Sequence, residues 1–158
     1  MAVPQQIQDL DNLVRRANNV LFRAETVFPF DFFPDVLIVD QNKIDVITRN
    51  FFYSEQIYSI LIRDIQAVHI EKSLFFSVLK VEVTGFETNP PPIRYLKNEE
   101  ALRARRIIMG LVAASKERIQ MGTIPQGEVL HKVEAIGRAE EPLPQQQLKQ
   151  NEQERHYP

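Results

Sequence analysis

The feature that most constrains the fold is an uninterrupted series of strand-forming segments between Asp35 and Lys97, with no helical pattern among them. Short runs rich in β-branched and aromatic residues alternate there with polar, turn-forming pieces. The six runs are DVLIVD, KIDVITRNFF, IYSILIR, IQAVHIEKS, LFFSVLKVEVTG and PIRYLK. Strands without intervening helices favour an antiparallel sheet that curls into a sandwich or small barrel. We therefore predict an α+β, mainly β chain, with an antiparallel split barrel or sandwich of about six to seven strands.

An aromatic segment, VFPFDFFPDVLIVD, leads into the first of these runs. Its two prolines, Pro29 and Pro34, restrict the backbone to extended geometry. All ten phenylalanines of the chain lie between Phe22 and Phe86, which predicts an early and central core. The phenylalanines at 30, 32 and 33 are therefore expected to enter or seal the barrel.

A helical pattern precedes the strands. From Pro4 to Ala24, apolar residues recur at spacings of three and four opposite a polar face. This predicts an N-terminal amphipathic helix within residues 1–26, one face of which packs on its own domain or on a partner. The candidate partner-binding residues of that face are Leu10, Leu13 and Val14.

A second helical pattern follows the last strand and predicts a capping helix. Asn98 is a favourable helix N-cap, and the two glutamates after it suit the positive end of the helix dipole. We expect a helix of about five turns that stops near Gly122. Gly110, in its middle, costs about 1 kcal/mol relative to alanine, which predicts a close approach to the sheet there.

The remainder of the chain predicts a short helix and a polar tail. A thin apolar stripe indicates a helix within 120–138 that ends at Gly137. Residues 139–158 are rich in Gln, Glu and Pro with few apolar side chains, so we expect a disordered tail. The predicted main domain then occupies 27–119, between this part and the N-terminal helix of 1–26.

The order of elements resembles that of bacterial pleckstrin-homology-like domains, a superfamily that includes GRAM-type modules. The resemblance covers about Val27 to Arg118, and it is carried by FPFDFFPDVLIVDQNKIDVITRNFF, IRDIQAVHIEKSLFFSVLKVEV and IRYLKNEEALRARRIIMGLVAA. It implies a split barrel whose open end is plugged by the final helix. Because such domains are mostly binding modules, it also implies a non-enzymatic role, whose ligand the fold alone does not specify.

The eukaryotic lipid-binding branch of that superfamily is a poorer match. It places several basic residues around the first hairpin, whereas here Lys43 and Arg49 alternate with Asp40 and Asp45. The tryptophan common in its final helix is absent. Both departures argue against phosphoinositide binding.

No residue pattern predicts catalysis or metal binding. His69, His131 and His156 are scattered without the spacing of a zinc site. The aspartates at strand starts and hairpins are expected to bond local backbone amides. The chain has no cysteine, no glycine-rich phosphate loop and no nucleophile elbow. We predict that it is not an enzyme and has no catalytic residues, cofactor, metal or small-molecule substrate.

Charge and composition limit the partners and the compartment. The net charge of −2 gives no overall attraction for a polyanion, and no aromatic residues interleave with the arginines of the final helix, so nucleic-acid binding is not expected. The lack of cysteine and of a secretory signal predicts a cytoplasmic protein. The longest apolar stretch is far shorter than the roughly 20 residues that span a membrane.

Two hypotheses for function remain open. The first is a module for protein binding or self-association, through the N-terminal stripe and Phe76. Phe75 and Phe76 are adjacent in a strand and must face opposite sides, which leaves one of them exposed or covered by something else. The alternative is peripheral contact with a membrane or anionic lipid, although the LRARR cluster also fits a solvated helix face. The candidate lipid-binding residues are Lys43, Arg49, Arg103 and Arg106.

Overall fold

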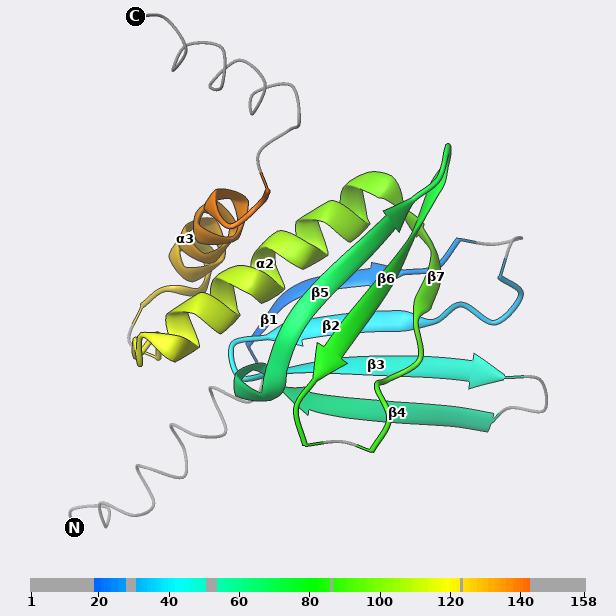
Figure 1. The fold of residues 1–158 in the computed structure, drawn as a ribbon, viewed down its shortest axis with the longest axis horizontal. Coiled ribbons are helices and arrows are strands. Elements are labelled where there is room, and N and C mark those ends of the chain that lie inside the picture. The colour runs from blue at the N-terminus through cyan, green and yellow to red at the C-terminus, as the bar shows by residue number, and fades with distance from the viewer. Residues whose placement is uncertain (1–18, 28–30, 51–53, 86, 123, 143–158) are drawn as a thin grey trace, which may run out of the picture.

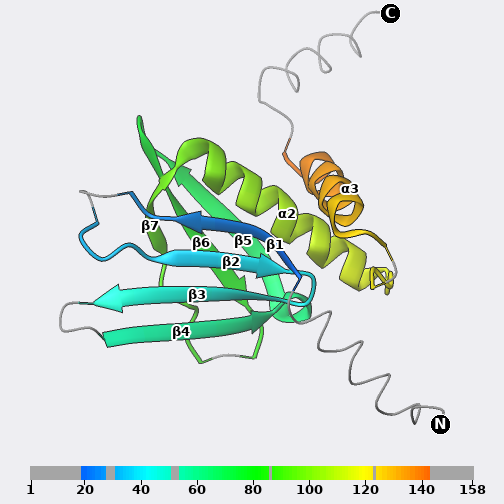
Figure 2. The ribbon, with the colours of Figure 1, turned by 180° about the vertical axis from the view of Figure 1, so that it is seen from behind.

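The computed structural model describes residues 19–27, 31–50, 54–85, 87–122 and 124–142. Over these residues the protein is α+β and mainly β, with two antiparallel sheets followed by two helices (Figures 1 and 2). The first sheet has the order β1-β2-β3-β4, and its strands are β1 (Val20–Glu25), β2 (Val36–Asp40), β3 (Lys43–Asn50) and β4 (Ser54–Leu61). The second has the order β5-β6-β7, with β5 (Ile65–Lys72), β6 (Phe76–Val83) and β7 (Ile93–Lys97). The remaining elements are a 3-10 turn, η1 (Ile62–Asp64), and the helices α2 (Asn98–Lys116) and α3 (Gln126–Ala139).

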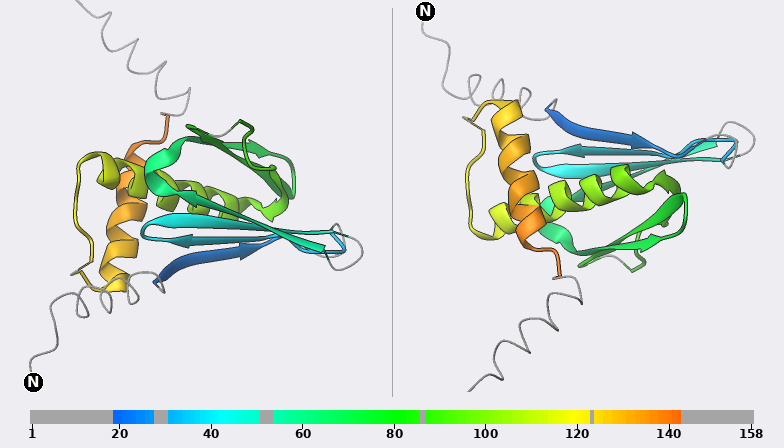
Figure 3. Two further views of the ribbon diagram at one scale, coloured as in Figure 1. Left: turned by 90° about the horizontal axis from the view of Figure 1, so that it is seen from below. Right: turned by 90° about the horizontal axis from the view of Figure 1, so that it is seen from above.

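The two sheets form facing layers, and α2 lies along the open side between them (Figure 3). It contacts strands of both sheets, whereas α3 packs mainly on α2. In the described part of the chain the sheets do not close into a barrel, because β4 pairs only with β3 and β5 only with β6. The core is apolar, and each fully buried side chain contributes about 1.5 to 3 kcal/mol. Its largest fully buried members include Leu37, Ile44, Ile60, Leu79, Ile93, Leu96, Ile107, Ile108 and Leu111.

The turn between β2 and β3 is built by an aspartate, as the sequence predicts. The Oδ1 atom of Asp40 accepts hydrogen bonds from the backbone N–H groups of Asn42, at 2.6 Å, and Lys43, at 2.9 Å. Asp40 is buried, so these bonds satisfy a carboxylate that has little access to water. The hairpin register follows, with Val39 opposite Ile44.

The N-terminal helix prediction is wrong over its last turn, because Val20 to Ala24 belong to strand β1. Leu21 and Ala24 are three residues apart, which suits a helix, but both are buried in the strand. An irregularity in the β1–β2 register between Val20 and Phe22 makes this possible, since a regular strand would place residues three apart on opposite faces. Pairing with β2 therefore overrides the helical spacing. The rest of the predicted helix, with Leu10, Leu13 and Val14, lies outside the described residues.

The aromatic loop before β2 differs from its prediction as well. Phe32 is 72% exposed and Phe33 is also exposed, so neither enters the core. Their loop is held instead by polar contacts around Asp31, whose carboxylate accepts hydrogen bonds from the hydroxyl of Thr26 and the backbone N–H of Phe33. Phe30 lies outside the described residues.

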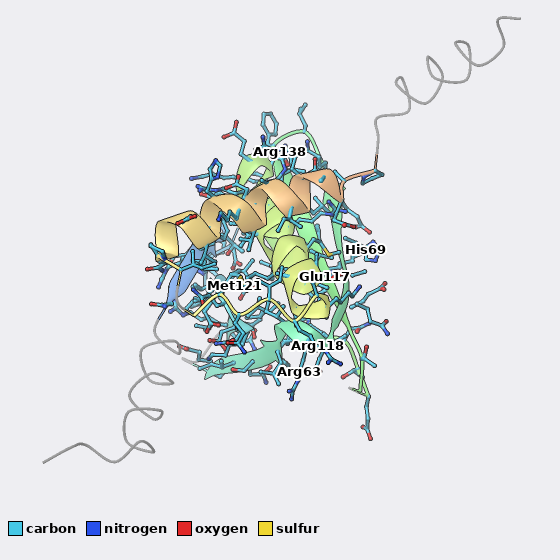
Figure 4. All side chains as sticks on the ribbon, turned by 90° about the vertical axis from the view of Figure 1, so that its left-hand side faces the viewer. Arg63, His69, Glu117, Arg118, Met121 and Arg138 are labelled. Carbon is cyan, nitrogen blue, oxygen red and sulfur yellow. The ribbon has the colours of Figure 1, made fainter. Side chains whose placement is uncertain are left out.

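Helix α2 ends at Lys116, six residues before the predicted stop at Gly122. The turn after it follows a Schellman motif, in which the N–H of Ile119 bonds the carbonyl of Ala114 at 3.0 Å. Arg118 occupies the left-handed position of that motif, with φ of 56°. Glycine is the usual residue there, so Arg118, labelled beside Glu117 in Figure 4, gave no local signal for this end.

Helices α2 and α3 approach each other through two glycines. A Cβ atom on Gly110 would lie 1.8 Å from the carbonyl oxygen of Val133, and one on Gly137 would lie 1.7 Å from that of Arg106. The close approach predicted at Gly110 is therefore real, but it is to α3 and not to the sheet. Gly137 is a packing residue inside α3 and not its end, which lies at Ala139. The last residues of the predicted tail, beyond 142, lie outside the described part of the chain.

Candidate docking surface

The basic residues of the lipid hypothesis do not form one site. Lys43 and Arg49 lie on β3 and face carboxylates of the same sheet. The Nζ atom of Lys43 lies 2.7 Å from Oδ2 of Asp45, and this hydrogen bond raises the pKa of Lys43. Arg49 lies beside Glu55, with 3.7 Å between Nε and Oε2. The positive charge of this hairpin is thus matched locally.

Arg103 and Arg106 of α2 face acidic side chains in or just after α3, whereas Arg105 donates to the carbonyl of Val68 on β5 at 3.1 Å. Arg106 binds Glu141 with two hydrogen bonds, of 2.6 and 3.2 Å, and the guanidinium lowers the pKa of that carboxyl. Arg103 donates to Glu134 at 3.4 Å, and its guanidinium carbon lies 5.8 Å from the centre of the Phe22 ring. The cluster that suggested an anionic partner therefore binds groups of the protein's own fold, in α3, just after it and on β5.

The exposed apolar side chains gather instead at the turn between β5 and β6. Leu74 is 83% exposed and Phe75 is 72% exposed, at the tip of a hairpin that projects past the start of α2 (Figure 1). Phe75 is exposed and Phe76 is half-buried, as predicted, but the reason differs, because Phe75 lies in the turn and β6 begins at Phe76. Turns normally carry polar residues or glycine, so two large apolar side chains here require another explanation.

The tip is held in place by Asn98, the first residue of α2. Its Oδ1 atom accepts a hydrogen bond from the buried hydroxyl of Ser77 at 2.6 Å, and its Nδ2 donates to the carbonyls of Ser73 and Leu74 at 3.1 and 3.4 Å. The prediction that Asn98 caps the helix is wrong, because the N-cap position is Lys97 and Asn98 makes no capping bond. The side chain anchors the hairpin instead.

A row of aromatic rings leads from the tip onto the outer face of the second sheet. The ring centres of Phe75 and Phe76 are 6.5 Å apart, and those of Phe76 and Tyr95 are 6.3 Å apart in an edge-to-face arrangement. Beside this row lies an open groove of about 400 Å³, to which Val78 and Pro92 contribute. We call Leu74, Phe75, Phe76 and Tyr95 the hairpin surface.

A β-bulge places Tyr95 on this surface. Ser77 pairs with Leu96 and Leu79 with Ile93, so two residues of β7 lie opposite the single residue Val78 of β6. Tyr95 adopts φ of 61°, a left-handed conformation that costs a non-glycine residue about 1 to 2 kcal/mol. Its carbonyl accepts a hydrogen bond of 3.1 Å from the N–H of Val27 in the segment after β1. The bulge therefore both directs the ring outward and connects the two sheets.

Charged side chains continue along the same face. Lys80 forms an ion pair with Glu71, and His69 lies 3.2 Å from Glu82. Arg94, the other residue of the bulge, is exposed and forms no ion pair with any residue that the structure describes. The face is thus apolar at the hairpin tip and carries an unmatched cation beside the aromatic row.

Neither metal nor membrane-spanning features occur among the described residues. No group of three His, Cys, Asp or Glu side chains comes together there, and no described helix is long and apolar enough to cross a membrane. No protein-family model matches the chain, and no curated protein matches it significantly.

Sequence reasoning located part of this surface. It selected Phe76, the less exposed of the two adjacent phenylalanines, and omitted Leu74 and Tyr95. The available signal for Leu74 was the run SLFF at a point where a hairpin must turn. Tyr95 gave none, because its position depends on a bulge that the pattern of PIRYLK does not reveal.

Proposed function

We propose that the chain is a non-enzymatic, pleckstrin-homology-like interaction module that binds a protein partner through the hairpin surface. The observation that carries the proposal is the pair Leu74 and Phe75, which are exposed at a turn whose carbonyls accept two hydrogen bonds from Asn98. The family part of the proposal rests on the resemblance in sequence, and the structure adds only the coarser observation of four and three antiparallel strands followed by a helix.

The energetics favour binding as the purpose of this turn. Leaving Leu74 and Phe75 in water forgoes about 1.5 to 3 kcal/mol for each side chain that burial would contribute. A partner that covers them recovers this free energy, and a preformed turn reduces the entropy lost on association. Exposed aromatic anchors beside a groove are typical of the residues that dominate protein interfaces.

A protein is favoured over an anionic membrane because of the charges. Lys43, Arg49, Arg103 and Arg106 each face a carboxylate, so they offer no shared positive patch for lipid head groups. Anionic membrane binding usually requires clustered, accessible cations beside the inserted apolar residues. Peripheral membrane contact therefore remains the alternative that the experiment tests.

The test compares affinity capture from the native cell lysate by the full chain, by the double variant Leu74→Ser/Phe75→Ser, and by Ile57→Ser. Ile57 is 62% exposed on β4 of the other sheet and serves as the matched control. We expect a protein that the full chain and Ile57→Ser both retain and that the double variant loses. All three should unfold at similar urea concentrations, since exposed substitutions change stability by about 0.5 kcal/mol or less.

Two results would overturn the proposal. One is identical capture by the double variant and the full chain. The other is salt-sensitive sedimentation with anionic liposomes that the double variant alone has lost, which would replace the protein partner with a membrane. If light scattering shows a concentration-dependent oligomer that only the double variant lacks, the partner is a second copy of this chain.

A further inference from the structure

We infer that the hairpin surface, together with Arg94 beside it, binds a protein segment in which an Asp or Glu side chain lies next to an apolar side chain. This inference rests on the proposed function and specifies the chemistry of its partner. The observations that carry it are the bulge in β7 and the unmatched charge of Arg94.

The bulge puts a cation and an aromatic ring next to each other on one face. In a regular strand the consecutive residues Arg94 and Tyr95 would point to opposite sides of the sheet. Here both lie opposite Val78, both are exposed, and both line the groove. The buried residues on either side, Ile93 and Leu96, keep their inward orientation.

The left-handed backbone of Tyr95 supports a role for this arrangement. Strained conformations of this kind persist only where the surrounding structure fixes them, and they are concentrated at functional sites. The hydrogen bond from Val27 and the pairing of Leu96 with Ser77 fix this one. The strained residue, Tyr95, directly follows Arg94. Among the described residues that line the groove, Arg94 is the only cation without an ion-pair partner.

The charges along the groove select for an acidic segment. Its lining includes two cations, Lys80 and Arg94, and a single carboxylate, Glu71. Glu71 is already paired with Lys80, so Arg94 is left to bind a carboxylate of the ligand. An arginine can bind a carboxylate through two parallel hydrogen bonds, which fixes the orientation of the segment. The neighbouring rings of Phe76 and Tyr95 then receive an apolar side chain.

The experiment uses a phage-displayed library of random peptides that are fused to the coat protein at their C-terminus. Carboxylates in the selected peptides then come only from Asp and Glu side chains. We expect the full chain to select peptides with Asp or Glu next to an aromatic or aliphatic residue. Selection on Arg94→Glu should replace the acidic position with Lys or Arg, and the peptide selected by the unaltered chain should bind Arg94→Glu at least about tenfold more weakly.

A matched control and a milder variant complete the design. Arg63→Glu changes an exposed arginine on η1, at the end of the molecule shown in Figure 4, and should leave the selected motif unchanged. Arg94→Gln removes the charge without reversing it and should lower affinity less than Arg94→Glu.

The outcomes separate the two proposals. Peptides that lose binding to Leu74→Ser/Phe75→Ser but bind Arg94→Glu as tightly as the unaltered chain would contradict the acidic motif and leave the docking function in place. Peptides that bind the double serine variant and the unaltered chain equally would contradict both.

Discussion

Polar and apolar groups have opposite roles in two regions, the contact between α2 and α3 and the hairpin between β5 and β6. At the helix contact, Arg103 and Arg106 of α2 form ion pairs with Glu134 and Glu141, and two glycines allow the helix backbones to touch. At the hairpin, hydrogen bonds of Asn98 with the buried hydroxyl of Ser77 and with exposed turn carbonyls support two large apolar side chains that remain in water. The arginines, which suggest ligand binding in the sequence, are paired within the fold. The exposed surface is formed instead by apolar side chains of the kind that usually belong to a core.

In this fold the charge of a side chain is a weaker guide to binding than its lack of a partner. The LRARR cluster is the strongest local charge in the sequence, yet all three of its arginines donate hydrogen bonds within the fold. Leu74 carries no charge and is the most exposed large apolar residue of the described chain. Substitutions in each region test this contrast.

The largest effect is expected from Gly137→Ala. The added methyl group would lie 1.7 Å from the carbonyl oxygen of Arg106, so the helices must separate. We expect a loss of about 3 kcal/mol in the free energy of unfolding, measured by urea denaturation, because overpacking against a rigid backbone has no cheap relief. Gly127→Ala, in the same helix with nothing near its Cβ position, should instead gain about 0.5 to 1 kcal/mol. Equal stabilities would show that α3 is not docked through these glycines.

Asn98→Ala should have an intermediate effect at the hairpin. It removes three hydrogen bonds and leaves the hydroxyl of Ser77 buried without this partner, which costs about 1 to 3 kcal/mol in urea denaturation. Asn42→Ala is the control, since Asn42 is exposed in the β2–β3 turn and its side chain makes no hydrogen bond to a described residue. We expect Asn42→Ala to change the free energy of unfolding by no more than about 0.5 kcal/mol. If Asn98→Ala costs no more than Asn42→Ala, the side chain of Asn98 does not hold the turn.

The smallest effect is expected from Glu141→Gln, and it depends on pH. Arg106 lowers the pKa of Glu141 below its unfolded value, so the pair stabilises the fold fully above the unfolded pKa of about 4.3. That contribution is lost as the pH falls through the lower folded value. We expect Glu141→Gln to cost about 1 kcal/mol at pH 7 and the difference from the unaltered chain to shrink below about pH 4.

Glu140→Gln provides the reference for that measurement. Glu140 is the exposed neighbour of Glu141 and forms no ion pair with a described residue, so its substitution should leave the pH dependence of unfolding unchanged. A pH-independent difference for Glu141→Gln would argue that the ion pair does not hold α3.

Local sequence patterns were enough to predict strands β2 to β7, whereas the predictions that failed concern features that depend on contacts with distant residues or on unusual backbone conformations. The runs from DVLIVD to PIRYLK become β2 to β7, because alternating β-branched residues and turn-forming aspartate act over a few positions. β1 was missed because its burial depends on pairing with β2 and on an irregular register. The end of α2 was missed because a left-handed arginine stands where the pattern expects glycine.

The same distinction applies to the candidate site. The exposure of one phenylalanine was predicted from alternation in a strand, but Phe75 is exposed because it lies in the turn before β6, which begins at Phe76. The partner of Arg103 is 31 residues away and that of Arg106 is 35 residues away, so no local spacing could show that these charges are neutralised. Asn98 reaches back 25 residues to Ser73, and its position before a helix made capping the natural but wrong interpretation.

The hydrogen bond from Val27 to the carbonyl of Tyr95 gives the molecule a built-in spectroscopic reporter. A ligand that contacts the Tyr95 ring or binds Arg94 should change the backbone of the bulge, and the amide of Val27 donates its hydrogen bond to the carbonyl of Tyr95 in that bulge. In an NMR titration the amide resonance of Val27, which follows β1 of the first sheet, should therefore shift together with the resonances of β7. The amide of Ile62, which bonds Asn42 at the far end of the same sheet, should stay in place. Occupancy of the surface would then be readable without any label on the ligand.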